Sequence, residues 1–432
     1  MESSSTEYHI QQIINIPPNI EPPLWPQCCI YKVPATLLNV KEEAYTPLLI
    51  SIGPLHHRNK TLEDMQEHKQ RYFHFFWNRL DKKSDLMNYK AFLEQEEDNI
   101  RHCYQKKIVD ISQKQFVDMI LLDAVFIMEL FLREKKRWEH KDDCIVTQHC
   151  ISKSIQRDLL LLENQLPIYV LEKLYDTVVP SSVKNHNRFI KLAHEYFASC
   201  YPHHKESSER MFEEKNWEKS LHFTDLIRYS YLPMKLSDQY MDSQNECLMS
   251  RRTATKLNEA GISFEKVYNR SLLDIKFKKR PFLCLFLCGC FPCFKARFLF
   301  PQLKVNHSTE SILRNLIAFE QCHYPDKPYI CNYVSFLDSL IDTKDDAELL
   351  VEKDMIVHEL GSHEELMSLV NNLSKHVVTN SSCYYQLMED LNEHYISGWR
   401  KAMGPLRRYG STLLGIGAVI FTLFHFLWRP RY

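Results

Sequence analysis

The sequence predicts a mainly α-helical protein: a large helical globular body with few short extended segments, plus one C-terminal transmembrane helix. Three observations lead to this prediction. The 432 residues include only nine glycines, and because tight turns and hairpins use glycine, this scarcity argues against all-β and Rossmann-type chains. Several stretches repeat apolar residues at helical spacing. The last long stretch, 409–428, has no charged side chain.

Residues 409–428, YGSTLLGIGAVIFTLFHFLW, are the predicted transmembrane helix. At about 1.5 Å per residue the run extends roughly 30 Å, which matches the hydrocarbon thickness of a bilayer. A buried core helix is the alternative, but a core helix of this length usually keeps one polar face. Aromatic and basic side chains flank the run, as expected at the two interfaces. The predicted membrane interface consists of Tyr409, Trp428, Arg407, Arg408 and Arg429.

The termini predict a single-pass membrane protein with a C-terminal anchor. The first residues, MESSSTEYHIQQ, lack the basic and apolar regions of a signal peptide. More basic residues precede the span than follow it, so the positive-inside rule favours a cytosolic body. The plasma membrane is the expected location. Glycans on the Asn-x-Ser/Thr sequons at Asn59, Asn269, Asn306, Asn372 and Asn380 would reverse the orientation.

Charge and cysteine usage narrow the partners. The net charge is −1 with both signs interleaved, so no global field would recruit nucleic acid. The fourteen cysteines show no framework spacing, which favours reduced thiols over a disulfide scaffold. We therefore expect two partners, the lipid bilayer and a protein of unknown identity.

Composition shifts divide the chain. A polar and proline-rich lead-in precedes a helical body, and the body contains a hydrophilic run typical of a subdomain linker and an apolar, cysteine-rich insertion. The predicted segments are the lead-in 1–27, the body 28–398 with the linker 202–218 and the insertion 281–297, the span 409–428, and the tail 429–432.

Local patterns predict the elements of the body in order. Residues 45–57 read as a buried extended segment ended by Gly53-Pro54. Thr61 with Asp64 is typical of a capping box at the start of a helix. Residues 116–130 form an apolar stripe with Asp123 among its members. Residues 157–174 read as a deeply buried helix that Pro167 breaks or kinks.

The second half predicts further helices. Residues 254–264 show a helical pattern in which Gly261 suits a C-cap. Residues 312–320 form an apolar stripe. Thr343 with Asp346 starts the next helix, which we expect to stop near Gly361, and Ser362 with Glu365 caps another. The two helix starts, at Thr343 and at Ser362, are predicted from the spacing of a capping box.

Three polar residues are expected in the core. Glu163 and Asn164 lie beside the break at Pro167, where they would hydrogen-bond freed backbone groups; a ligand-binding carboxylate is the alternative. Glu320 extends the stripe from Leu316 and should have an arginine or backbone amides as partners, because an unpaired buried charge is expensive. The predicted structural polar core is Glu163, Asn164 and Glu320.

The insertion PFLCLFLCGCFPCF at 281–294 is too short to span a bilayer and is flanked by basic residues. It suits the surface of an anionic leaflet, where its thiols would be S-acylated. A packed loop without such a role is the alternative, and the irregular cysteine spacing disfavours a metal site. The candidate S-acylation sites are Cys284, Cys288, Cys290 and Cys293.

No catalytic or cofactor motif is present. The sequence lacks GxGxxG, a P-loop and GxSxG. HELGSH at 358–363 resembles a zinc-protease signature but is one residue too long to place its histidines on one helix face. We therefore expect no catalytic, cofactor or metal residues and a non-enzymatic recognition or signalling protein. The alternatives are a membrane-associated enzyme with a buried Cys/His/Glu site and a peripheral lipid-binding protein.

Several segments together resemble the plant family known as domain of unknown function 247. They occur in the family's order and cover nearly the whole body, although the insertion departs from the pattern. The resemblance implies a plant membrane protein in a recognition setting, since some relatives act in pollen–stigma self-incompatibility in grasses; it implies no catalytic residues. The matching segments are IYKVP (30–34), YTPLLISIGPLHH (45–57), MQEHKQRY (65–72), FVDMILLDAVFIMEL (116–130), RDLLLLENQLPIYVLEKL (157–174), ATKLNEAGISF (254–264), LLDIKF (272–277), LRNLIAFEQC (313–322) and YVSFLDSLIDTKDDAELL (333–350).

Overall fold

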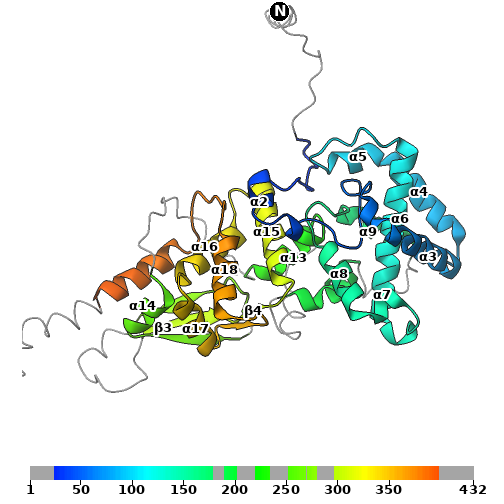
Figure 1. The fold of residues 1–432 in the computed structure, drawn as a ribbon. Coiled ribbons are helices and arrows are strands. Elements are labelled where there is room, and N and C mark those ends of the chain that lie inside the picture. The colour runs from blue at the N-terminus through cyan, green and yellow to red at the C-terminus, as the bar shows by residue number, and fades with distance from the viewer. Residues whose placement is uncertain are drawn as a thin grey trace, which may run out of the picture.

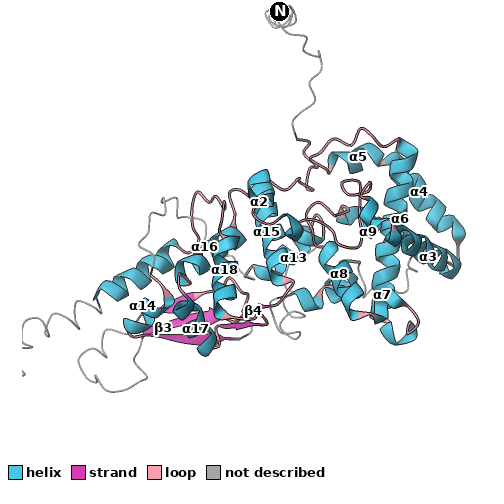
Figure 2. Ribbon diagram, viewed as in Figure 1, coloured by secondary structure: helices cyan, strands magenta, loops and turns pink. Residues whose placement is uncertain are grey.

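A helical part and a smaller part containing strands lie at opposite ends of the molecule, and one apolar core runs through both (Figures 1 and 2). This arrangement comes from a computed structural model. The residues that the structure describes are 24–178, 189–201, 219–233, 252–268, 270–279 and 296–397.

The helical part is built around α6, whose positions are buried on almost every side because its sequence is apolar nearly all round. Helices α3, α4, α9 and α11 pack against it (Figure 1). The helices of this part are α2 (Ala35–Leu38), η1 (Glu42–Ala44), η2 (Lys60–Leu62), α3 (Asp64–Arg79), α4 (Lys83–Gln95), α5 (Glu97–His102), α6 (Gln113–Lys135), η3 (Arg137–Glu139), α7 (Cys144–Thr147), α8 (His149–Asp158), α9 (Ile168–Val178), α11 (Phe189–Tyr196) and η4 (Ala198–Cys200).

The second part combines helices with two small sheets. Helices α15, α16 and α18 pack together, and α14 and α17 lie beside the strands (Figure 2). Its elements are α13 (Phe223–Tyr231), α14 (Ala254–Glu259), β1 (Ile262–Val267), β2 (Lys276–Lys278), β3 (Ala296–Pro301), β4 (Leu303–Val305), α15 (Thr309–His323), α16 (Tyr329–Leu340), α17 (Lys344–Glu352), β5 (Ile356–His358) and α18 (His363–Leu373). Residues 385–397 are also helical.

Strand β3 is the centre of the larger sheet. It pairs in parallel with β1, with Phe264 opposite Phe298, and antiparallel with β2, with Phe277 opposite Phe298. The smaller sheet pairs β4 with β5 in parallel, with Leu303 opposite Ile356. Aromatic and aliphatic side chains fit this half-buried pleated surface.

The N-terminal described segment joins the two parts. It runs beside α15, so that the blue and yellow ribbons lie together in Figure 1. The hydroxyl of Tyr31 lies 2.9 Å from Nδ1 of His323, and the ammonium of Lys41 lies 2.7 Å from the carboxylate of Glu310. Contacts between residues this far apart in sequence fix the first segment against the second part.

The predicted fold class is wrong, although the described residues are mainly helical as predicted. No helix in the described ranges combines the length and the apolar character needed to cross a membrane. The longest helix among them, α6, carries Asp123, Glu129 and Arg133 within its buried positions. Residues 409–428, from which the transmembrane helix was predicted, lie outside the described residues. The strands also form two hydrogen-bonded sheets rather than isolated extended segments.

Two helix boundaries differ from the sequence prediction. Helix α3 begins at Asp64 without a side-chain cap, because Thr61 belongs to the preceding turn η2, which the side chain of Asn59 caps. Residues 157–174 are not one kinked helix: α8 ends at Asp158 and α9 begins at Ile168. The leucines between them are buried in irregular backbone, which apolar periodicity cannot distinguish from a buried helix.

Other local predictions are confirmed. Thr343 and Asp346 form a capping box at the start of α17, and the hydroxyl of Ser362 accepts from the amide of Glu365 at the start of α18. Gly261 follows α14 with φ of +81°. Helix α17 ends at Glu352 rather than near Gly361, because β5 occupies the intervening residues.

The linker 202–218 and most of the predicted insertion lie outside the described residues. Among the basic residues that flank the insertion, Lys276, Lys279 and Arg297 are described and form ion pairs within the chain. Lys276 lies 3.2 Å from Asp274, and Arg297 lies 3.4 Å from Glu265.

Candidate functional site

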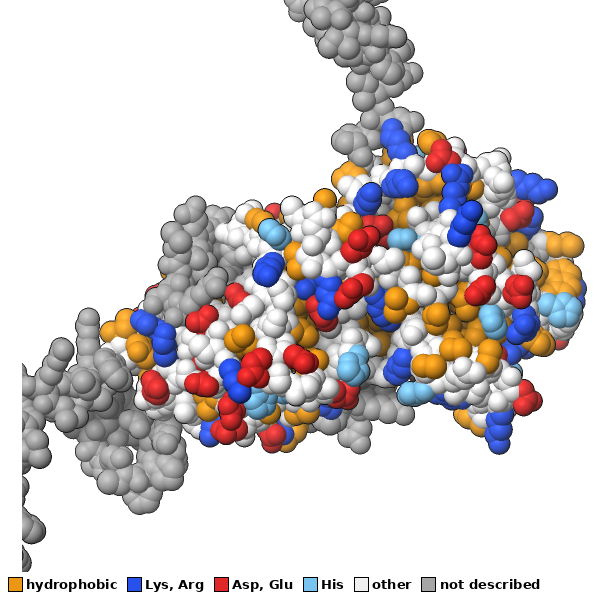
Figure 3. Space-filling model, in the orientation of Figure 1, with side chains coloured by type: hydrophobic (Ala, Val, Ile, Leu, Met, Phe, Trp, Pro, Cys, Tyr) orange, Lys and Arg blue, Asp and Glu red, His pale blue; other side chains and the backbone are white. Residues whose placement is uncertain are grey.

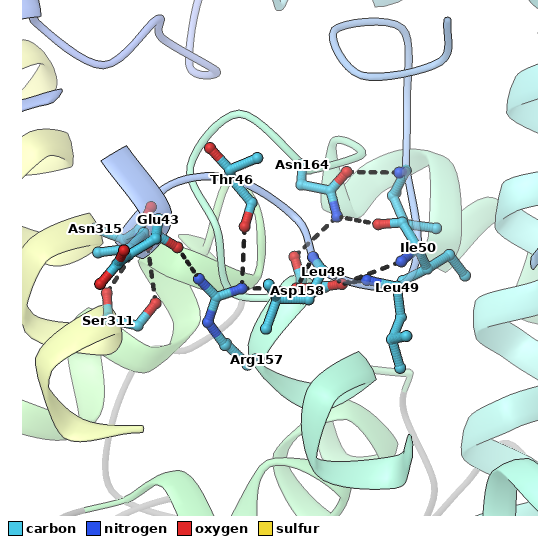
Figure 4. A network of polar contacts seen from close by, with 12 residues as sticks. Glu43, Thr46, Leu48, Leu49, Ile50, Arg157, Asp158, Asn164, Ser311 and Asn315 are labelled. Carbon is cyan, nitrogen blue, oxygen red and sulfur yellow. Dashed lines mark hydrogen bonds and ion pairs between the residues drawn. The ribbon is translucent and has the colours of Figure 1, made fainter. Parts of the chain in front are cut away.

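A layer of buried polar side chains holds the irregular segment 48–53 at the centre of the helical part. This segment belongs to no sheet, so its backbone amides need other acceptors. The carboxylate of Asp158, at the end of α8, supplies them: it accepts from the amides of Leu48 at 3.0 Å, Leu49 at 2.7 Å and Ile50 at 3.1 Å (Figure 4). A single fully buried carboxylate therefore accepts the amide hydrogen bonds that the carbonyls of a neighbouring strand would accept in a sheet.

Asn164 continues the layer from the loop between α8 and α9. Its Oδ1 accepts from the amide of Ile52 at 2.6 Å, and its Nδ2 donates to the carbonyls of Ile50 and Asp158, each at 2.9 Å (Figure 4). Both amide hydrogens and the oxygen are used, and the side chain is fully buried. Asn164 therefore hydrogen-bonds backbone groups of residues 50–52 and of the end of α8.

Lys69 of α3 and Asp123 of α6 complete the layer. The Lys69 ammonium donates to Asp123 Oδ1 and to the carbonyl of Ser51, each at 2.5 Å. Asp123 Oδ2 accepts from the amide of Gly53 at 2.8 Å. A buried ion pair needs further hydrogen bonds to its remaining lone pairs and protons, and here the backbone of residues 51–53 supplies one to each charged group.

Gly53 is required by this arrangement. Its φ is +71°, and a Cβ there would lie 2.7 Å from the carbonyl oxygen of Gln165 and 2.9 Å from the hydroxyl of Tyr104. Glycine has access to this conformation without a steric penalty, whereas other residues rarely adopt it. The Gly53-Pro54 turn predicted from sequence therefore marks the point where the segment meets the layer.

A second set of contacts ties residues 43–46 to α8 and α15. Arg157 donates to the carbonyls of Glu43 and Thr46, while the side chains of Ser311 and Asn315 donate to the carbonyl of Ala44 (Figure 4). Side chains thus hold the carbonyls of the segment before residue 48, and both the amides and the carbonyls of residues 48–53.

Glu163 lies beside this layer rather than in it. Its Oε1 accepts from the amide of Val33 at 2.7 Å, and its Oε2 lies 3.9 Å from Nε2 of His56. Burial raises the pKa of the Glu163 carboxyl, against the backbone hydrogen bond and the charge of Lys32, which lower it. Burial lowers the pKa of His56 to about 4, with the charge of Lys106 acting in the same direction. Glu163 thus holds the N-terminal segment through the amide of Val33.

Glu320 of α15 lies in the second part, apart from the other two predicted polar residues. It accepts from Nε of Arg228 at 2.7 Å and from the amides of Ile330 at 2.7 Å and Cys331 at 3.0 Å. Burial raises the pKa of its carboxyl, while Arg228 and the two amides lower it. The predicted partners, an arginine and backbone amides, are both present.

Sequence reasoning missed Lys69, Asp158 and the Asp225–Arg228 region of α13. A signal existed for Asp123, which occupies a core position in an apolar stripe and therefore needs a partner. No comparable signal existed for Asp158, since an aspartate at a helix end is also typical of a solvated surface.

The cysteines of the described residues are free thiols. Burial raises the pKa of Cys28 and Cys322 to about 11, and of Cys383 to about 12, so these thiols are poor nucleophiles. Cys103 differs, because a hydrogen bond from Cys29 lowers its pKa, against the effect of burial. Within the part of the chain that the structure describes, no three histidine, cysteine or acidic side chains are placed to hold a metal ion.

The remaining predicted site residues lie outside the described residues. They are the membrane-interface residues Tyr409, Trp428, Arg407, Arg408 and Arg429 and the candidate S-acylation sites Cys284, Cys288, Cys290 and Cys293.

Comparison with known proteins gives one family and two relatives. A family model described as a plant protein of unknown function, DUF247, matches residues 30–427. UPF0481 protein At3g47200 of Arabidopsis thaliana is 29% identical over 426 residues, which cover 92% of this chain and 84% of that protein. Putative UPF0481 protein At3g02645, also of Arabidopsis thaliana, is 20% identical over 507 residues, which cover 93% of this chain and 90% of that protein. No solved structure matches the chain.

Proposed function

We propose that this chain, which belongs to the DUF247 family of plant proteins of unknown function, is a non-enzymatic recognition or signalling protein that binds a protein partner through its surface. The observation that carries the proposal is the hydrogen bonding of three buried polar side chains, those of Asp158, Asn164 and Glu320, to groups that hold the fold together. Asp158 and Asn164 hydrogen-bond backbone groups, and Glu320 hydrogen-bonds Arg228 and backbone amides. Groups used in this way hold the fold and leave the surface for function.

An exposed tryptophan supports a protein partner. Among the tryptophans that the structure describes, Trp25 stacks on His102 and Trp77 packs against the core. Trp138 in η3 is instead 68% exposed. Exposed aromatic side chains of this size are enriched among the residues that contribute most to protein–protein affinity.

The surface charge supports a partner other than nucleic acid. On the face shown in Figure 3, acidic and basic side chains of the described residues are interleaved rather than gathered into a basic stripe. Nucleic-acid-binding surfaces usually concentrate lysine and arginine.

Proximity labelling in plant tissue tests this proposal. The intact protein would be compared with Trp138→Ala and with the matched control Met87→Ala, whose side chain is 65% exposed elsewhere on the helical part. We expect Trp138→Ala to lower labelling of a defined partner by roughly tenfold or more, as hot-spot truncation does, while Met87→Ala leaves it unchanged. A labelling profile that is the same for both variants and the wild type would contradict the proposal.

One observation favours the enzyme alternative. Nε2 of His56 is buried, has no hydrogen-bond partner among the described residues and lies near the carboxylate of Glu163. An imidazole oriented by a carboxylate is one part of a general-base arrangement. Hydrolysis of a panel of activated esters that His56→Gln abolishes would support the alternative; turnover that His56→Gln leaves unchanged would eliminate it.

Localisation at the plasma membrane with a cytosolic body stays a prediction. It comes from residues 409–428, which lie outside the described residues. Carbonate extraction of the intact protein and of a version ending at Met403 checks it: the first should stay with membranes and the second should be released.

A further inference from the structure

We propose that the hollow between α6, α8, α11 and η4 is a binding site for a small organic anion with a flat apolar body. The hollow has a volume of about 300 Å³, which is at the lower end for small-molecule sites. This site goes beyond protein recognition and does not depend on it.

The floor of the hollow is apolar and partly aromatic. Phe131 of α6 and Tyr196 of α11 stack with ring centroids 4.3 Å apart and planes 23° apart, and Leu192 lies beside them on α11. Phe131 and Leu192 are buried, so the rest of the core supports the stacked rings on the side away from the hollow. Such a floor suits a planar or aliphatic ligand body.

The wall carries an ammonium group with only neutral partners. Nζ of Lys153 donates to Oε1 of Gln156 at 3.0 Å and to the hydroxyl of Ser199 at 2.6 Å. No carboxylate among the described residues forms an ion pair with it. An ammonium has three N–H donors and here two are used, so one donor and the full charge remain for a ligand.

The other cations of the hollow are already paired. Lys135 lies 3.0 Å from Glu195, and Arg137 lies 3.9 Å from Glu134. With three cations and two carboxylates in the wall, the hollow keeps one positive charge when His149 is neutral. This balance suits a ligand with one anionic group.

Helix α8 adds to the positive potential. His149 and Ser152, in its first turn, line the hollow, and its N-cap residue Gln148 makes no side-chain cap. The amino end of a ten-residue helix favours nearby negative charge. The hydroxyl of Tyr196, in the floor of the hollow, is buried and has no hydrogen-bond partner among the described residues. The ligand class is therefore a small aryl or alkyl carboxylate or phosphate.

Titration of the full-length protein with benzoate, phenyl phosphate and the uncharged benzyl alcohol tests the site. We expect saturable binding of at least one anion, with a dissociation constant on the order of millimolar or tighter. Benzyl alcohol should bind at least about tenfold more weakly, because it lacks the charge that Lys153 would pair with. Benzoate and phenyl phosphate together show which head group is preferred. Isothermal calorimetry or ligand-observed NMR provides the readout.

Two variants and one control decide the assignment. Lys153→Gln should weaken anion binding about tenfold or more, while Lys191→Gln, an exposed residue of α11 that does not line the hollow, should not. Ser199→Trp places a large ring at an exposed wall position and should abolish binding without disturbing the core, so it decides the question even where Lys153→Gln fails to fold. Absence of saturable binding, equal binding of benzyl alcohol, or unchanged binding by Ser199→Trp would overturn the proposal.

Discussion

Lys69 and Asp123 form an ion pair in which each side chain is only 1% exposed. The same two side chains also hydrogen-bond the backbone of Ser51 and Gly53. The pair therefore joins α3 and α6 to each other and to residues 51–53. The pair therefore stabilises the fold both by linking α3, α6 and residues 51–53 and by the attraction between its two charges.

Breaking the pair from one side should be costly. Lys69→Met leaves the Asp123 carboxylate buried without its counter-charge, so we expect the free energy of unfolding to fall by roughly 3–5 kcal/mol. The half-exposed pair Lys90–Asp118 is the matched control, and Lys90→Met should change stability by less than about 1 kcal/mol. Denaturant titration of both variants measures the difference. Equal effects would show that burial of the pair is unimportant.

Two glycines with similar backbone geometry predict different responses to alanine. Gly53 and Gly261 both have positive φ, but a Cβ at Gly261 meets nothing within 4 Å whereas one at Gly53 meets a carbonyl oxygen and a hydroxyl. Gly261→Ala should cost about 1–2 kcal/mol from backbone strain alone. Gly53→Ala should cost roughly 3 kcal/mol or more, because the contacts add to the strain. Thermal and denaturant unfolding of the two variants test the expected order.

Removal of the Asp158 carboxylate should release segment 48–50. Asp158→Ala leaves three backbone amides without their acceptor, among them that of the buried residue Ile50. We expect a loss of roughly 2–4 kcal/mol, since each unsatisfied buried group costs about 1–3 kcal/mol. Asp158→Asn keeps one acceptor oxygen and should lose less. Hydrogen exchange at residues 48–50 gives a local readout, and unchanged protection in Asp158→Ala would refute the role.

Stability should fall in mild acid because of His222. This side chain is fully buried, donates from Nε2 to the carbonyl of Cys29 at 3.0 Å and has a pKa lowered to about 3, chiefly by burial. Between pH 6.5 and pH 3 the unfolded chain binds a proton that the folded chain does not, so the free energy of unfolding decreases as pH falls. At pH 5 the loss from this histidine should be about 2 kcal/mol.

Asp225, in contact with the amide of Leu221, opposes this trend. Burial raises its pKa to about 6, so between about pH 4 and pH 6 the folded chain holds the extra proton and stability falls as pH rises. His222→Gln should therefore lose less stability than the wild type between pH 7.5 and pH 5, by about 2 kcal/mol. Part of the acid sensitivity should remain, because burial also lowers the pKa of His56 and of His194 to about 4. Denaturant unfolding at pH 7.5 and pH 5 checks it, and a His222→Gln variant as acid-sensitive as the wild type would contradict the assignment.

Local patterns in the sequence predicted features that depend on neighbouring residues. The capping box at Thr343, the N-cap at Ser362, the glycine after α14 and the burial of Glu320 all follow from spacing and residue type. Even the partner of Glu320 was predicted by class, since a carboxylate at a core position requires one.

Features that depend on distant residues were not predictable in this way. The buried leucines at 159–162 lie in irregular backbone because the side chains of Asn164 and Gln165 donate to carbonyls of residues 158–161. The spacing of apolar residues does not reveal such hydrogen bonds. The sheets were missed because β2, β4 and β5 have three residues each and pair with strands far along the chain. The Lys69–Asp123 pair likewise joins two stripes that the sequence presents separately.

The attachment of residues 31–44 to α15 has a consequence for synthesis on the ribosome. The partners of Tyr31 and Ala44 are His323 and Ser311, so the opening segment emerges long before the groups that immobilise it are translated. Contacts across such sequence distances slow folding and leave early segments exposed. A nascent chain released before residue 311 would lack the contacts of residues 31–44 with α15, although the contacts of the same segment with Arg157 and Glu163 could form. Such chains should be captured by chaperones or degraded more often than the full-length chain.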